Sequence, residues 1–339
     1  MRRTLRRTHG KYGRIMMTPR GPFRLWLLAL SASLAAALLW VISIGEVRIP
    51  AGEIIDVILG NISGADPRAV IVLSIRLPRA LAASAVGAVL AGSGVVFQGV
   101  LLNPLAEPYT LGVATGAAFG ASLAITLRLP FIPPFAFAGG VAALGLVWIL
   151  GHGGRDSSSS TRLILAGVIV GSVLGAGITL IKALAGDQVG VIVLWLLGSF
   201  SLSSWGDVGW SMASALLVLL LGIFWARDMD VISSGVNPRS LGVDDRKTVG
   251  FLLFGCSLAT AIAVSISGII GFVGLVVPHL IRLVSGPSHA RLVPLSVLGG
   301  ALLLLLADTA ARSLGELPVG VITALIGGPI FCFLLWRGR

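Results

Sequence analysis

The sequence predicts an all-α protein that crosses a membrane several times. Of its 339 residues, 56% are hydrophobic and only 12% are charged, whereas soluble domains carry about 25% charged residues. The mean hydropathy of +0.98 is too high for a chain of this size to fold in water or to stay disordered. Many uncharged stretches also approach the length of about 20 residues that a helix needs to cross the bilayer core.

Eleven such stretches are candidates for membrane spans. The longest, 248–281, counts as two helices because Ser265, Ser267 and Gly268 interrupt it. The stretches in order are 25–44, 80–102, 108–127, 129–151, 163–181, 188–206, 208–226, the two halves of 248–281, 292–307 and 317–336.

The stretch 188–206 is the weakest candidate because its second half consists largely of glycine and serine. If it does not cross, ten spans place both termini on the cytoplasmic side, with 18 of the 25 bases inside and 7 outside. If it crosses, 11 bases lie inside and 14 outside. Since Lys and Arg stay preferentially on the cytoplasmic side, we predict ten spans. Residues 188–204 then form a short or re-entrant element on the outer side, covered by protein.

The chain divides into a basic cytoplasmic tail, 1–24, and a single transmembrane domain, 25–339. Eight bases lie in the tail. They favour an anchor that also attracts anionic lipid headgroups over a nucleic-acid site. A cleaved signal peptide is a lesser alternative, because the apolar run 25–44 is long for one and lacks a clear cleavage site.

Several kinds of chemistry lack the residues they need. Cys256 and Cys332 lie in apolar runs, and the four histidines are scattered, so no metal site is expected. Ionisable groups that could relay a coupling ion are nearly absent from the spans. None of the three lysines has the spacing of a phosphate-binding loop. ATP could therefore act on this protein only through a separate ATPase.

The largest inside loop, 227–247, contains one predicted turn of helix. Asn237 and Pro238 form a good start and Gly242 a good stop, which predicts a helix over Pro238–Leu241. Pairs of aspartates flank it on both sides. A solvated, turn-rich loop is the alternative interpretation, and it would also explain the aspartates.

Glycines recur every four residues in two of the predicted spans. Gly167, Gly171 and Gly175 do so in the fifth span, and Gly116 and Gly120 in the third. This spacing lets helix backbones approach closely in lipid. Ordinary packing and a moving helix pair beside a pathway remain equal alternatives.

Six segments, in order from about residue 70 to the C-terminus, together resemble the FecCD family, the permease subunits of ABC importers for ferric siderophores, haem and cobalamin. Each segment alone is weak, and the six together are highly specific. They are Ile75–Arg79, Gln98–Pro108, Leu165–Val168, Trp195–Gly198, Gly271–His279, and Glu316–Gly320 followed by Thr323–Gly327.

The resemblance implies a BtuC-like, type II ABC importer fold with ten transmembrane helices per subunit. It implies a homodimer that works with two ATP-binding-cassette ATPase subunits and one extracytoplasmic substrate-binding protein. ATP and Mg would bind the ATPase, and this chain would be no enzyme and hold no cofactor or metal. It would lie in the cell (inner or plasma) membrane, in contact with lipid and without nucleic acid.

The resemblance also implies roles for particular residues. Arg76, Arg79 and Arg312 match external arginines that pair with the binding protein, although Arg76 and Arg79 could simply anchor the second span. The matches to the cytoplasmic gate are Asn103, Leu105, Ser159 and Ser160. The matches to the ATPase-coupling helices, within 227–247, are Asn237, Pro238, Arg239, Ser240, Leu241 and Gly242. Where many relatives have an acidic residue after the loop glycine, this chain has Val236, and residues 1–24 have no family counterpart.

The expected function is therefore inward transport of a bulky metal chelate, with ferric siderophore as first choice. Cobalamin, haem and molybdate stay open, because no charged pocket in the sequence selects one ligand. An ion-coupled carrier and a membrane-embedded enzyme or structural subunit are distant alternatives.

Overall fold

The computed structural model describes residues 22–45, 47–64, 66–152 and 159–337, and these residues form helices and no β-strand. The predicted tail 1–24 lies outside the described residues except for its last three positions. Ten helices correspond to the ten predicted spans. They are α2 (Phe23–Ser43), α5 (Leu77–Val100), α6 (Val113–Thr126), α7 (Pro133–His152), α8 (Ser159–Leu184), α10 (Trp205–Phe224), α12 (Asp245–Ser267), α13 (Val273–Ser285), α14 (His289–Ser313) and α15 (Val319–Arg337).

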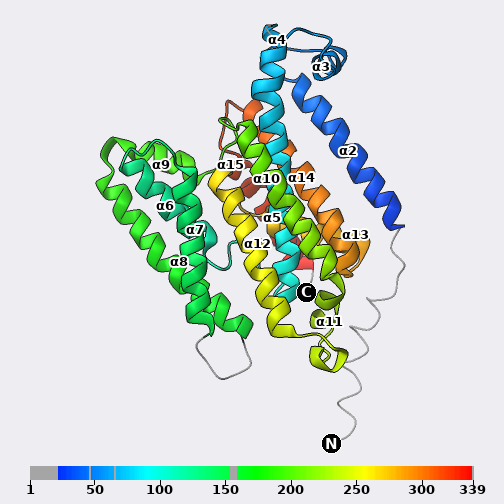
Figure 1. Cartoon of the computed structure of the whole chain (residues 1–339), viewed down its shortest axis with the longest axis vertical. Helices are drawn as coiled ribbons and strands as arrows, with labels where there is room; N and C mark the ends of the chain where they lie inside the picture. The colour runs from blue at the N-terminus through cyan, green and yellow to red at the C-terminus, as the bar shows by residue number, and fades with distance from the viewer. Residues whose placement is uncertain (1–21, 46, 65, 153–158, 338–339) are drawn as a thin grey trace, which may run out of the picture.

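Seven of these helices have the length and hydropathy of a complete membrane span, and α6, α13 and α15 are shorter apolar helices. The long helices run up and down between two ends of the molecule (Figure 1). One end carries α3 (Ala51–Ile58) and α4 (Pro67–Val70), and the other carries α11 (Ala226–Ser233). We refer to them as the α3 end and the α11 end.

Residues 188–204 form a short element, as predicted. The turn η2 (Gly186–Gln188) leads into α9 (Val189–Leu196), whose eight residues rise only about 12 Å. Other helices supply partners for the irregular backbone that follows. Ser199 donates its N–H to the carbonyl of Ser267, and the carbonyl of Gly198 accepts from Val319. Other parts of the protein thus satisfy several of the backbone groups between α9 and α10.

The central helix is α5, which is buried along nearly its whole length among α10, α12, α13 and α14 (Figure 1). Its small residues allow backbone-to-backbone contact. A Cβ added at Gly87 would lie 2.2 Å from the carbonyl oxygen of Gly300 in α14, and one at Gly94 would lie 2.0 Å from that of Gly274 in α13. Close approach of this kind drives helix association in lipid, where helices have no hydrophobic force between them.

Helices α6, α7, α8 and α9 form a group beside the central helices (Figure 1). The α6–α7 contact uses the glycine pair found in the sequence. A Cβ at Gly116 would lie 2.4 Å from the carbonyl oxygen of Gly139, and one at Gly120 would lie 2.1 Å from that of Phe135. These glycines therefore serve packing inside the subunit.

The second span begins earlier than predicted, because α4, η1 (Ile71–Arg76) and α5 form one helical run from Pro67 to Val100. The expected start at residue 80 was wrong because it assumed that bases end a span. Arg76 and Arg79 are instead buried inside the run. Helices α3 and α11 were not predicted either.

Candidate functional site

The loop 227–247 at the α11 end contains the predicted turn. The segment η3 (Pro238–Leu241) begins after Asn237, whose side-chain oxygen accepts a hydrogen bond from the Arg239 N–H at 3.2 Å. It ends at Gly242, whose φ of +78° favours glycine. The Arg239 guanidinium pairs with Asp245 at 3.2 Å, and both side chains are largely exposed. This turn therefore protrudes as a small, rigid, solvent-accessible feature.

Helix α11 forms the first part of this loop and connects the η3 turn to the helices of the transmembrane domain. Asp230 accepts hydrogen bonds from the His289 backbone N–H at 2.9 Å and from the Ser288 hydroxyl at 3.3 Å, and its carboxylate lies 2.6 Å from the His289 Nδ1. Partial burial alone would raise the pKa of Asp230, but the hydrogen bonds from His289 outweigh it and hold this pKa below its usual value. The Asp230 side chain is 39% exposed, but it also links α11 to the start of α14.

His289 connects α11 onward to the central helix. Its ring is buried, and its Nε2 lies where a Cβ on Gly99 of α5 would come within 2.5 Å. Any larger residue at Gly99 would displace the ring. His289 is the first residue of α14. Its side chain thus links α14 to the last turn of α5 and, through Asp230, to α11. Sequence reasoning missed the contact of Asp230 with His289, because these two residues lie 59 positions apart.

The turn 101–112, between α5 and α6, carries the two residues that match a gate. The Asn103 side-chain oxygen accepts a hydrogen bond from the Leu105 N–H at 2.9 Å, so it folds back onto its own turn. The Leu105 side chain is 53% exposed. Leu102 adopts a positive φ of 53°, a conformation that costs a leucine energy and that the surrounding turn must enforce.

Tyr109 fixes the end of this turn to the segment between α12 and α13. Its hydroxyl donates to the Ile270 carbonyl at 2.9 Å and accepts from the Ile270 N–H at 3.2 Å. Beside it, Pro108 lies against Gly274, where an added Cβ would come within 2.6 Å of the proline Cδ.

The glycines of α8 have unequal roles. A Cβ at Gly167 would lie 2.1 Å from the carbonyl oxygen of Thr110, so α8 contacts the end of the 101–112 turn there. One at Gly171 would meet only the Thr115 hydroxyl at 3.5 Å, and one at Gly175 would meet nothing within 4 Å. The even spacing in the sequence therefore does not produce an evenly packed stripe. Ser159 and Ser160 are the first two residues of α8.

The three arginines that match docking residues lie at the α3 end and bond to this chain. Arg79 pairs with buried Asp308 at 2.8 Å and with Glu316 at 2.9 Å. Arg76 donates to the carbonyls of Ile42 and Val47, and Arg312 donates to those of Val41 and Ile44. Several of these carbonyls belong to the last turn of α2. The last carbonyls of a helix have no N–H donor within that helix, so the arginines supply one. A docking role for the arginines stays a prediction. The Glu316 side chain, 54% exposed, is more accessible than that of Arg79, to which it is paired.

The structure shows no candidate metal site in the part of the chain that it describes: no three His, Cys, Asp or Glu side chains gather there. The described titratable groups instead form helix-joining pairs such as Arg79 with Asp308 and Asp230 with His289.

Comparison with known protein families agrees with this architecture. The model of the FecCD transport family matches residues 33–337. The chain belongs to this family. It is an ABC transporter permease with several membrane-spanning helices, and ATP hydrolysis belongs to a partner ATPase rather than to this chain.

Three curated relatives of this FecCD permease have described substrates. It is 44% identical to a cobalamin import system permease of Halobacterium salinarum over 78% of this chain and 73% of the relative. It is 40% identical to a probable iron chelatin transport system permease of Helicobacter pylori, over 80% and 83% of the two chains. It is 38% identical to a hemin transport system permease of Yersinia pestis, over 89% and 94%.

Among solved structures, the fold matches an ABC transporter assigned to the metal-chelate type and captured in an inward-facing conformation. The TM-score is 0.81 at 31% sequence identity, over 92% of this chain and 98% of the other. This agreement supports the BtuC-like fold expected from the sequence.

Proposed function

We propose that this FecCD permease moves a bulky metal chelate inward across the cell membrane, and that the chelate is a ferric siderophore. One observation carries the proposal most directly. The chain matches, over 78% to 92% of its length, both a transporter of the metal-chelate type and permeases for an iron chelate, hemin and cobalamin. These ligands share a large, rigid shape around a metal.

Cobalamin is the second candidate, because the Halobacterium relative that imports it has the higher identity, 44%, over a shorter matched length. Haem follows from the Yersinia relative, and molybdate is the least supported. A separate substrate-binding protein would make most of the choice among them.

The expected complex is a homodimer of this permease with two ATPase subunits and one external binding protein. Both termini and the α11 end would face the cytoplasm, which agrees with the excess of bases on that side. The exposed Arg239–Leu241 turn would contact the ATPase, and the α3 end, with Glu316, would receive the binding protein.

The mechanism is alternating access driven by the ATPase. ATP binding would move the η3 turn and α11, and the Asp230–His289 pair would pass that motion to α14 and to the last turn of α5. The next residues after α5 form the 101–112 turn with Asn103 and Leu105. Since Tyr109 ties this turn to Ile270 and Gly167 of α8 lies against it, a shift of α5 relative to α8 would open or close the exit near Ser159 and Ser160.

Uptake in cells with and without this gene tests the proposal. We expect deletion to abolish uptake of a labelled ferric siderophore while labelled cobalamin uptake is unchanged, and the plasmid-borne gene to restore it. Loss of cobalamin uptake alone would reassign the substrate and leave the permease function intact. Retention of both, in cells without a second importer, would contradict both assignments.

A further inference from the structure

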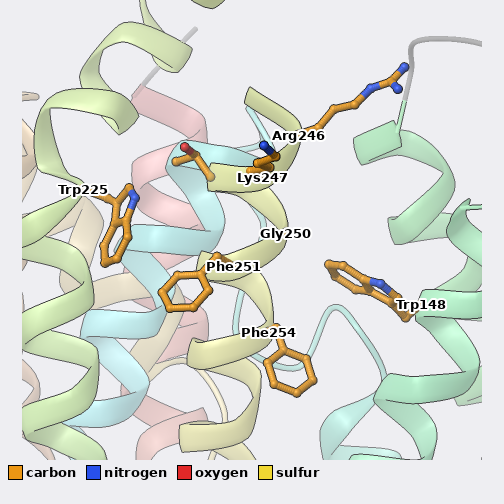
Figure 2. A pocket seen from close by; sticks show the side chains of 8 residues that line it. Trp148, Trp225, Arg246, Lys247, Gly250, Phe251 and Phe254 are labelled. Atoms are coloured by element: carbon orange, nitrogen blue, oxygen red, sulfur yellow. The ribbon is translucent and has the colours of Figure 1, made fainter. Parts of the chain in front are cut away.

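A crevice of about 580 Å³ lies between α7 and α12 at the α11 end. Figure 2 shows Arg246 and Lys247 at one end of it, Phe251 and Phe254 further along α12, and Trp148 of α7 opposite Gly250. Its volume falls within the range of about 300–1,000 Å³ that is typical of small-molecule sites.

The crevice has a charged end and an apolar end because of the order of residues along α12. Arg246, Gly250 and Phe254 follow one another at intervals of four, so they lie along one face of the helix. With a rise of 1.5 Å per residue, Phe254 lies about 12 Å from Arg246 along the axis. A ligand in the crevice would therefore have a polar head and an apolar body of about this length.

The walls are aromatic and open to the surroundings of the protein. Phe251 and Phe254 are 54% and 50% exposed, although they lie well inside a helix with the length and hydropathy of a membrane span. Phe251 packs on Trp225 with ring centroids 5.0 Å apart. Gly250 leaves space between α12 and α7, because a Cβ at this position would already contact the Trp148 ring at 3.4 Å.

The charges at the mouth favour an anion. Lys247 pairs loosely with Asp244 at 3.4 Å, and the neighbouring Asp245 pairs with Arg239. Arg246 forms no ion pair with the described residues, and Figure 2 shows its side chain extended away from α12. A guanidinium without an ion pair among the described residues and a half-neutralised ammonium favour an anionic headgroup.

We propose that this crevice binds one anionic phospholipid of the leaflet at the α11 end, with its phosphate at Arg246 and Lys247 and an acyl chain between Trp148 and Phe254. Basic pockets between spanning helices bind such headgroups on the cytoplasmic side of membranes. The lipid would join α7, in the α6–α9 group, to α12, in the central group.

Native mass spectrometry of the full-length permease in detergent, titrated with phosphatidylglycerol or phosphatidylcholine, tests this site. The wild type is expected to bind one phosphatidylglycerol more tightly than phosphatidylcholine. Arg246→Gln should weaken phosphatidylglycerol binding about fivefold, since a base near a lipid surface contributes about 1 kcal/mol. Arg48→Gln, which removes the same charge at the α3 end, should change nothing.

A second variant tests the acyl position. Gly250→Leu places a side chain against Trp148 and should weaken both lipids, whereas Gly145→Leu on α7, where a Cβ would meet nothing within 4 Å, should not. Equal binding of the two lipids by the wild type would overturn the proposal, as would unchanged binding by Arg246→Gln. Loss of the lipid when the ATPase assembles would also overturn it and assign the crevice to that subunit. Because no transport is measured, failure of this proposal is distinct from failure of the proposed function.

Discussion

Asp230 and His289 illustrate how single residues connect distant parts of this permease. Asp230 by itself is an ordinary surface acid in a polar loop. Its contact with the His289 backbone and ring turns it into the only described acidic anchor between α11 and α14. Hydrogen bonds to a charged group contribute about 1.5–3 kcal/mol, enough to carry a movement from one helix to the next.

Asp230→Ala should therefore uncouple ATP hydrolysis from uptake. In proteoliposomes holding the whole complex, we expect ATPase activity to persist while uptake per ATP falls about tenfold, which corresponds to the loss of about 1.4 kcal/mol of coupling. The measurement is labelled-substrate uptake and phosphate release in the same vesicles. Asp228→Ala is the matched control, because it removes an acid from the same helix without removing a described contact to α14. Parallel losses of both activities would show that Asp230 only supports folding.

At the scale of elements, glycines decide which helices meet and how closely. The mutual contact of Gly87 and Gly300 brings the backbones of α5 and α14 together, and each carbonyl lies 2.2 Å from where the other residue's Cβ would be. The same residue type at Gly175 of α8 meets nothing within the subunit. Sequence spacing alone therefore identifies helices that can pack closely but not the contact that each glycine makes.

Gly87→Ala should destabilise the permease by about 1–3 kcal/mol, the typical cost of overpacking a well-packed core. We expect a lower midpoint in thermal unfolding of the detergent-solubilised protein, followed by its fluorescence. Gly145→Ala, on the open side of α7, should leave the midpoint unchanged or raise it slightly, because alanine favours helix more than glycine does. Equal midpoints for both variants would contradict the role assigned to the Gly87 contact.

At the scale of the whole molecule, the distribution of bases predicts orientation. The α11 end carries the loop 227–247 and the starts of α12 and α14, and the α3 end carries the segments after α2 and α9 (Figure 1). The ten-span topology puts 18 of the 25 bases on the same side as the loop 227–247, so the α11 end should face the cytoplasm.

Cysteine labelling checks this orientation. In a Cys332→Ser background, which removes the exposed native thiol while buried Cys256 remains, Leu202→Cys should react with a membrane-impermeant maleimide in intact cells. Val236→Cys should react only in inverted vesicles. Both positions are well exposed, at 93% and 50%, so they serve as controls for each other. The reverse pattern would contradict the ten-span topology as oriented here.

The predictability of this fold from sequence depends on the kind of signal. Apolar length located the ten helices that correspond to the predicted spans, because bilayer thickness and backbone hydrogen bonding leave few alternatives. The distribution of bases then identified 188–204 as a short element. The same criterion misplaced the start of α5, because Arg76 and Arg79 looked like residues that end a span. They are buried only because carbonyls of α2 and the carboxylates of Asp308 and Glu316 lie around them.

The sequence by itself determined that this chain is a polytopic membrane protein, with ten spans, a rigid turn at Pro238–Leu241 and the motifs of the FecCD family. These properties depend on local composition, charge and spacing, which a linear chain displays directly. Only the tertiary structure decided that Asp230 contacts His289 and that Tyr109 bonds the 101–112 turn to Ile270. It also decided that Arg246 lies at one end of an aromatic crevice. Each of these contacts joins residues from separate helices, and their free energy exists only once packing has brought those helices together.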